Sequence, residues 1–166
     1  MRRSLASLLL LFVAASNARG ADDTASVLLY NTHTGERLRV GRYLPSPRAL
    51  DRFLRSRKAR RYTLMDPRLV LAAVTAARAH GRTAVHIISA FRPRALNEAM
   101  RLAGHKVARR SRHTSGQALD LRIPGLETRA LCRYFDRVHG GGVGCYQGAR
   151  FVHIDVGPRR RWGFGR

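Results

Sequence analysis

Apolar residues at helical spacing alternate along this chain with short apolar stretches of strand length. The helical spacing predicts helices over residues 47–57, 67–80, 93–103 and 127–138, with Pro47 and Pro67 at first helical positions. Strand patterns cover residues 25–30, 37–40, 84–89, 118–123, 143–146 and 150–155. Mixed helices with a small, mostly antiparallel sheet predict one α+β domain.

The strand predicted over residues 118–123 carries a carboxylate in its middle. Leu119 and Leu121 point to one face, which we expect to be the core, and Asp120 points to the other. A carboxylate in such a strand is costly unless it is paired or bound to a cation. A salt bridge to one of the many arginines would explain Asp120 taken alone.

Two histidines near carboxylates favour a metal site instead. His113 lies in a turn before this strand, and His153 shares a face of the last strand with Asp155. His113, Asp120 and His153 would give zinc three ligands and leave a fourth position for water, which the ion would activate for hydrolysis. Zinc suits such nitrogen and oxygen ligands better than magnesium or calcium, which prefer oxygen alone.

Arg92 lies where the strand ending at Ser89 gives way to the helix after Pro93. From this junction its guanidinium could reach a cleft and stabilise the oxyanion formed when an amide is attacked. The alternative is one more solvent-facing arginine among many.

The N-terminal segment and the charge bear on where the protein acts. Residues 1–20 combine Arg2 and Arg3 with an apolar run and small residues, which predicts a signal peptide ahead of a domain over residues 21–166. Export by the general or the twin-arginine route stays open. The net charge of +22 will attract polyanions, and outside the cytoplasm these include lipids, lipopolysaccharide and the cell wall. An arginine-rich codon bias would explain the charge equally well.

The chain has two cysteines, Cys132 and Cys145. In an exported protein they could form a disulfide across the glycine-rich stretch between them. Two unpaired buried cysteines are nearly as consistent with the spacing, and we assign neither residue a chemical role.

Five motifs in order connect the chain with a known family: residues 31–36 (NTHTGE), 88–93 (ISAFRP), His113-x-x-Gly116-x-Ala118-x-Asp120, 140–144 (GGGVG), and 151–158 (FVHIDVGP) closing at Trp162. With these motifs the chain resembles the YcbK-like, murein endopeptidase K family of LAS-type zinc peptidases. The resemblance covers roughly residues 27–162.

The resemblance implies roles for single residues. The zinc ligands fall on His113, Asp120 and His153, the oxyanion-stabilising arginine on Arg92, and Ser111 lies beside the ligands without binding the metal. The implied fold is a small central antiparallel sheet with flanking helices, as in hedgehog domains and D-alanyl-D-alanine peptidases. The implied activity is hydrolysis of amide bonds in the peptide cross-links of peptidoglycan, in the periplasm. We also expect a monomer without a transmembrane segment or a nucleic-acid partner.

The sequence does not identify the catalytic base. Many relatives in the wider group place Glu or Asp three residues before the last zinc histidine, where this chain has Arg150, which cannot accept a proton. Asp155 is the nearest substitute. It could serve as the base that holds the attacking water, or it could orient the imidazole of His153 instead.

The sequence is also consistent with three other functions. Without a carboxylate at position 150, the protein could be a catalytically silent module that binds the cell wall and keeps zinc for stability. It could also be a D,D- or L,D-carboxypeptidase, since the sequence does not say which bond is cut. Binding of nucleic acid through the basic charge is a weaker alternative, because an export signal argues against it.

Overall fold

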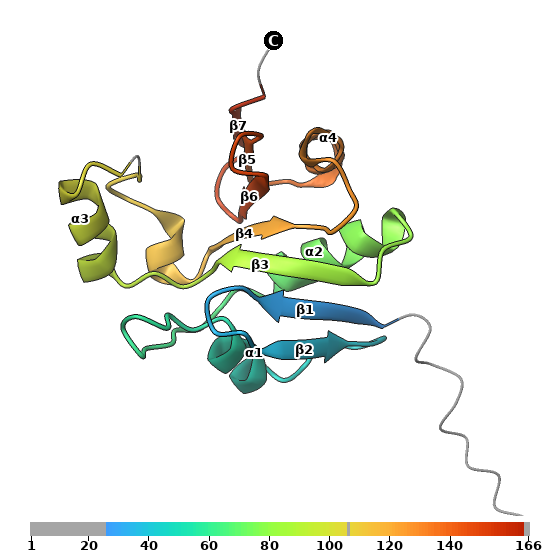
Figure 1. Ribbon diagram of the computed structural model, residues 1–166, viewed down its shortest axis with the longest axis horizontal. Helices are drawn as coiled ribbons and strands as arrows, with labels where there is room; N and C mark the ends of the chain where they lie inside the picture. The colour runs from blue at the N-terminus through green and yellow to red at the C-terminus, as the bar shows by residue number, and fades with distance from the viewer. Residues whose placement is uncertain (1–25, 106, 165–166) are drawn as a thin grey trace, which may run out of the picture.

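Seven strands form one sheet in the computed structural model, which describes residues 26–105 and 107–164 (Figure 1). Their spatial order is β2-β1-β3-β4-β6-β5-β7. Their bounds are β1 Val27–Asn31, β2 Arg37–Val40, β3 Ala84–Ser89, β4 Ala118–Arg122, β5 Gly142–Tyr146, β6 Phe151–Asp155 and β7 Arg160–Trp162. The pairs β1–β3 and β5–β7 are parallel and the other four are antiparallel. The domain is therefore α+β as predicted, but its sheet is mixed and larger than the small antiparallel sheet we expected.

The first two α-helices begin where the sequence predicts, and the last two begin one residue later. Ser46 accepts a hydrogen bond from the backbone N–H of Ala49 and Asp66 from that of Arg68, and a proline follows each cap. The bounds are α1 Pro47–Phe53, α2 Pro67–Ala79, α3 Arg94–Leu102, the 3₁₀ turn η2 Arg112–Ser115, and α4 Thr128–Val138. The first helix ends at Phe53, four residues short of its predicted end.

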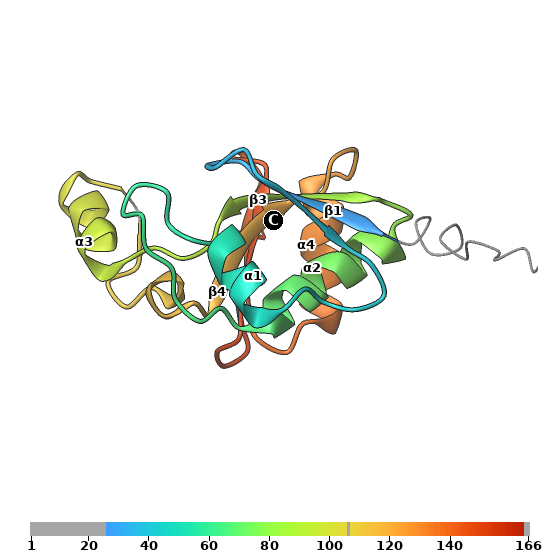
Figure 2. The same ribbon diagram turned by 90° about the horizontal axis from the view of Figure 1, so that it is seen from below.

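Helices cover one face of the sheet and bury its apolar side chains. Figure 2 shows α1, α2 and α4 on the same side, whereas α3 stands apart beyond the end of β3. Side chains from strands and helices meet in this layer with almost no exposed surface, among them Leu29, Leu50, Leu69, Leu119, Leu121, Phe135 and Ile154. Burial of each such side chain contributes about 1.5–3 kcal/mol relative to exposure, which anchors the strands that carry the polar residues on the other face.

The register of the three central strands fixes which polar residues face one another. β4 pairs with β6 so that Asp120 lies opposite His153. On its other side β4 pairs with β3, whose register shifts between Ile87 and Ser89 and brings Ser89 opposite Asp120. Such a bulge bends the strand and redirects the chain that follows it, which here leads to Arg92.

Cys132 of α4 and Cys145 of β5 form a disulfide. This settles the pairing that the sequence left open. The bond ties the helix to a strand that lies next to β6, and so to the neighbourhood of His153.

Some predictions fall outside this description. The signal peptide predicted for residues 1–20 lies outside the described residues. Among the helices that are described, none has the length and apolar character needed to cross a membrane. The strand β7 was not predicted from the sequence, because Arg160-Arg161-Trp162 is short and mostly polar.

Gly116 ends the 3₁₀ turn with a φ of +71°, and a Cβ there would overlap the carbonyl oxygen of Leu64. Gly35 has a similar φ of +75° but open space around it. We expect Gly35→Ala to cost about 1–2 kcal/mol of unfolding free energy, because only the backbone is strained. Gly116→Ala should cost roughly 1–3 kcal/mol more, because overlap is added. Denaturant unfolding of both variants measures the difference, and equal losses would contradict the close packing at Gly116.

Candidate metal centre

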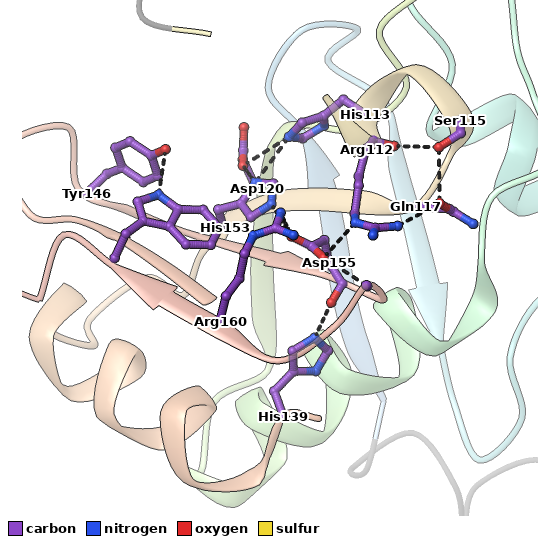
Figure 3. Close-up of polar contacts among 12 residues, drawn as sticks. Arg112, His113, Ser115, Gln117, Asp120, His139, Tyr146, His153, Asp155 and Arg160 are labelled. Atoms are coloured by element: carbon purple, nitrogen blue, oxygen red, sulfur yellow. Dashed lines mark hydrogen bonds and ion pairs between the residues drawn. The ribbon is translucent and has the colours of Figure 1, made fainter. Parts of the chain in front are cut away.

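Three side chains from separate elements converge on one point (Figure 3). His113 comes from η2, Asp120 from β4 and His153 from β6, and all three are buried. Asp120 Oδ1 lies 3.3 Å from His113 Nε2 and 2.8 Å from His153 Nδ1. The two histidine nitrogens are 3.3 Å apart. The structure therefore brings together the three residues that the sequence nominated as ligands.

These separations match the spacing of ligand atoms around a small cation. Zinc binds nitrogen and oxygen at about 2.0–2.1 Å in tetrahedral sites, which places neighbouring ligand atoms about 3.3 Å apart. Two of the three separations are 3.3 Å, and the third is shorter at 2.8 Å. Within the described ranges this is the one group of three or more such residues whose ligand atoms gather closely enough to hold a metal ion.

Outer hydrogen-bond partners can hold both imidazoles in the form that a metal requires. His113 Nδ1 lies 2.7 Å from the carbonyl oxygen of Ala90, which can only accept, so Nδ1 carries the proton and Nε2 is free. His153 Nε2 lies 3.2 Å from Oδ2 of Asp155, a carboxylate that can accept the ring proton and so leave Nδ1 for a metal ion. Nε2 of His113 and Nδ1 of His153 both face Asp120. Such outer partners orient the rings and raise their basicity as ligands.

Asp155 is fully buried and shares its two oxygens among four partners. Oδ1 accepts from the backbone N–H of Gly157 at 2.9 Å and lies 3.2 Å from Nε of Arg112. Oδ2 accepts from Arg160 at 2.7 Å and faces His153 at 3.2 Å. The carboxylate thus sits behind His153, on the Nε2 side of the ring, whereas Asp120 lies on the Nδ1 side (Figure 3).

The ionisation of these residues reflects a concentrated negative charge. Burial alone would raise the pKa of Asp120, but the charges and hydrogen bonds of His113 and His153 outweigh it and lower the pKa. Burial alone would lower the pKa of His153, yet hydrogen bonds with Asp120 and Asp155 raise it. In Asp155, His153, the N–H of Gly157 and Arg160 likewise overcome the effect of burial and lower the pKa. A point where two carboxylates stabilise positive charge is also favourable for a cation.

Arg92 faces the same centre from the end of β3. Its backbone N–H donates to the carbonyl oxygen of His113 at 3.0 Å. Its guanidinium donates to Ser89 at 3.2 Å and to the side chain of Asn97 at 3.3 Å. Partial burial lowers the pKa of Arg92, and the nearby charge of Asp120 opposes that effect. The guanidinium is thereby held in place while part of it stays exposed.

Two aromatic residues that the sequence did not nominate form another side of the site. The ring of Trp162 lies 5.3 Å from that of His153, and its N–H donates to the hydroxyl of Tyr146 at 3.0 Å. Trp162 can lie this close because residue 144 is glycine, since a Cβ there would overlap its indole. The Tyr146 oxygen accepts from Trp162, which leaves its own hydrogen available to a ligand.

The remaining nominated positions lie around the centre rather than in it. Ser111 is half-buried beside η2, and its carbonyl oxygen accepts from Thr114. Arg150, at the position where many relatives in the wider group carry an acidic residue, is exposed in the turn between β5 and β6. Arg112 and Arg160, which hold Asp155, were missed because nothing in the sequence distinguishes them among 32 basic residues.

Comparison with known proteins agrees with this geometry. The sequence model of the family described as "Peptidoglycan L,D-endopeptidase MepK", a branch of the M15 peptidases, matches residues 19–162. The chain belongs to the MepK family of peptidases. The MepK of Escherichia coli K12 is 36% identical over 141 residues, and the match covers 81% of this chain and 78% of that protein. The probable MepK of Haemophilus influenzae is 31% identical over 140 residues, and the match covers 80% of this chain and 75% of that protein. No solved structure gave a significant match.

The MepK family is metal-dependent, and the three gathered residues are where this chain could hold the ion. We predict that the metal-free protein takes up about one equivalent of zinc and that His113→Ala weakens uptake. The loss of zinc affinity should exceed the roughly 10–100-fold loss that follows when an outer hydrogen-bond partner of a ligand is removed.

Titration calorimetry measures the affinity, and His33→Ala is the matched control because His33 is exposed on the β1–β2 turn. Equal zinc affinity in His113→Ala and in the unaltered protein would contradict the assignment.

Proposed function

We propose that this protein is a zinc-dependent endopeptidase that hydrolyses amide bonds in the peptide cross-links of peptidoglycan. One observation supports this most directly: two imidazole nitrogens and one carboxylate oxygen gather at close to tetrahedral spacing, and an acceptor faces the other nitrogen of each imidazole. The relatives are named as peptidoglycan L,D-endopeptidases, and the same substrate class fits this chain.

Zinc is the metal that these residues fit best. Nitrogen ligands exclude the all-oxygen shells that magnesium and calcium prefer, and three protein ligands leave a position for a reactant. Bound there, zinc would supply Lewis-acid chemistry, by polarising a carbonyl group and making water more acidic. His113, Asp120 and His153 would hold it.

Arg92 is the residue that we assign to the substrate carbonyl. Its hydrogen bonds to Ser89 and Asn97 fix the guanidinium before the substrate arrives. A preorganised donor of this kind stabilises negative charge as it develops on the carbonyl oxygen. Its backbone N–H is bonded to His113, so the positions of the donor and of the metal ligand are coupled.

We infer that Asp155 orients His153 and does not act as the catalytic base. Both of its oxygens are occupied, and the carboxylate lies behind the imidazole and has no exposed surface. A base must come within hydrogen-bonding reach of the reacting water, and the imidazole of His153 stands between this carboxylate and the gathered ligand atoms. The contacts therefore favour the positioning role over the catalytic role for Asp155.

We further propose that the protein acts outside the cytoplasm, in the periplasm, with residues 1–20 as its signal peptide. The support is the substrate named for the relatives and the pattern of basic, apolar and small residues at the N-terminus. We propose that residues 21–166 form one peptidase domain of the hedgehog and D-alanyl-D-alanine peptidase type. One continuous sheet that carries the metal centre at its middle supports this.

Digestion of purified sacculi tests the function. We expect the zinc-loaded protein to convert cross-linked muropeptides to monomers, because an endopeptidase cuts between stem peptides. A zinc chelator should abolish the release, and added zinc should restore it. Chromatography of the soluble products measures the outcome.

His33→Ala serves as the active control and His113→Ala as the inactive one. Binding to sacculi with no new products would indicate the silent wall-binding module. Release of single terminal amino acids with intact cross-links would indicate a carboxypeptidase. Products that persist in chelator or in His113→Ala would contradict a metal-dependent reaction.

Asp155→Asn separates the two roles of that residue. If Asp155 orients His153, the substitution should weaken zinc affinity by roughly 10–100-fold and leave substantial activity at saturating zinc. If it were the base, zinc affinity would hold and kcat would collapse at every zinc concentration. Zinc titration and sacculus digestion over a range of zinc concentrations measure both quantities on the same preparation.

A further inference from the structure

A cavity of about 610 Å³ lies between α3 and the residues on either side of His113. Figure 1 shows α3 standing away from the sheet, with η2 between them. Five of the lining residues are arginines: Arg94, Arg109, Arg110, Arg112 and Arg160. A volume of this size lies within the roughly 300–1,000 Å³ that ligand sites span, which is more than a single ion needs.

The cavity adjoins the candidate catalytic residues at two places. Asn97 lines it and also accepts the hydrogen bond that holds Arg92. Arg112 and Arg160 line it and also bind the Asp155 carboxylate behind His153 (Figure 3). The cavity therefore borders the residues that hold Arg92 and Asp155 in place.

Positive charge in the cavity exceeds the negative charge available to balance it. Glu98 is the one acidic lining residue, and Arg101 occupies both of its oxygens at 3.0 and 2.6 Å. Among the described residues, Arg94, Arg109 and Arg110 have no acidic partner within ion-pair distance. Guanidinium groups gathered around a hollow without counter-charges favour an anionic ligand.

We propose that this cavity binds free carboxylate groups of the peptide substrate, next to the bond that is cut. Guanidinium groups bind carboxylates through paired, charge-assisted hydrogen bonds, so several of them can fix both the position and the direction of an acidic peptide. The inference rests on the proposed function, because it takes the substrate to be a wall peptide that carries such groups. It adds which part of the substrate is recognised, and by which residues.

The general basicity of the chain gives a matched comparison. Arg129 and Arg133 of α4 are also exposed, but they lie on a helix and line no cavity that adjoins the metal centre. If charge alone attracted the substrate, neutralising this pair would matter as much as neutralising Arg109 and Arg110. If the cavity recognises carboxylates, the two pairs will differ.

The test uses two synthetic cross-linked peptides that differ only in having free carboxylates or carboxamides. For the zinc-loaded protein we expect the acid form to bind at least about tenfold more tightly than the carboxamide form, because one charge-assisted hydrogen bond is enough for that difference. Arg109→Gln/Arg110→Gln should reduce this preference to near one and raise KM with kcat little changed. Arg129→Gln/Arg133→Gln should keep it. Fluorescence anisotropy measures binding, and peptide release measures kcat and KM.

The outcomes distinguish this inference from the proposed function. If neither peptide is hydrolysed, the proposed function fails, while anisotropy still shows whether the cavity prefers carboxylates. If hydrolysis proceeds with no preference for the acid form, or with one that survives Arg109→Gln/Arg110→Gln, the cavity assignment is overturned. Equal losses in both double variants, or displacement of the peptide by a short duplex DNA at equal affinity, would show bulk charge attraction and overturn it too. Matching melting temperatures exclude misfolding as the cause.

Discussion

The contact between Asp155 and His153 is the constraint on which the candidate metal centre depends. A carboxylate with no exposed surface is costly unless its charge is compensated, and Asp155 is compensated by Arg112, Arg160 and the N–H of Gly157 as well as by His153. These partners come from η2 and from residues 153–160. The Asp155 carboxylate therefore links η2, through Arg112, and β7, through Arg160, to the ring of His153. It also sets which nitrogen of that ring faces Asp120.

The sheet supplies the other half of the geometry. Antiparallel pairing of β4 with β6 places Asp120 opposite His153, so two candidate ligands meet through backbone register alone. The third, His113, is brought in by the short turn before β4, where its ring bonds to Ala90 just after β3. A one-residue slip of β6 would turn His153 to the other face, and the buried Val152 and Ile154 on that face oppose it. The apolar core thus fixes the strand register that brings the polar residues of the site together.

The sequence predicted the elements with strong periodicity and the residues that carry distinctive chemistry. Two histidines and an aspartate stood out, and the structure brings them together, although their role as ligands stays a prediction. Alternation along residues 150–155 placed Asp155 on the same face as His153, but it could not identify the side chains that bind its carboxylate oxygens. These include Arg112 and Arg160, which no local pattern separates from the other basic residues. The strand β7 was missed for a related reason, since its pairing with β5 is non-local and its residues are polar.

The position of Arg92 favours catalysis over a structural role for the metal. A zinc ion that only stabilised the fold would need its ligands and their outer partners, and these are complete without Arg92. Yet the guanidinium is partly buried, at a cost that lowers its pKa, and two side chains hold it toward the centre. Asn97, one of the two, is itself buried and borders the arginine-lined cavity. The Arg92 guanidinium is thus held in place although it donates to none of the three candidate ligands. A reaction that builds negative charge on a carbonyl oxygen requires a donor fixed in this way.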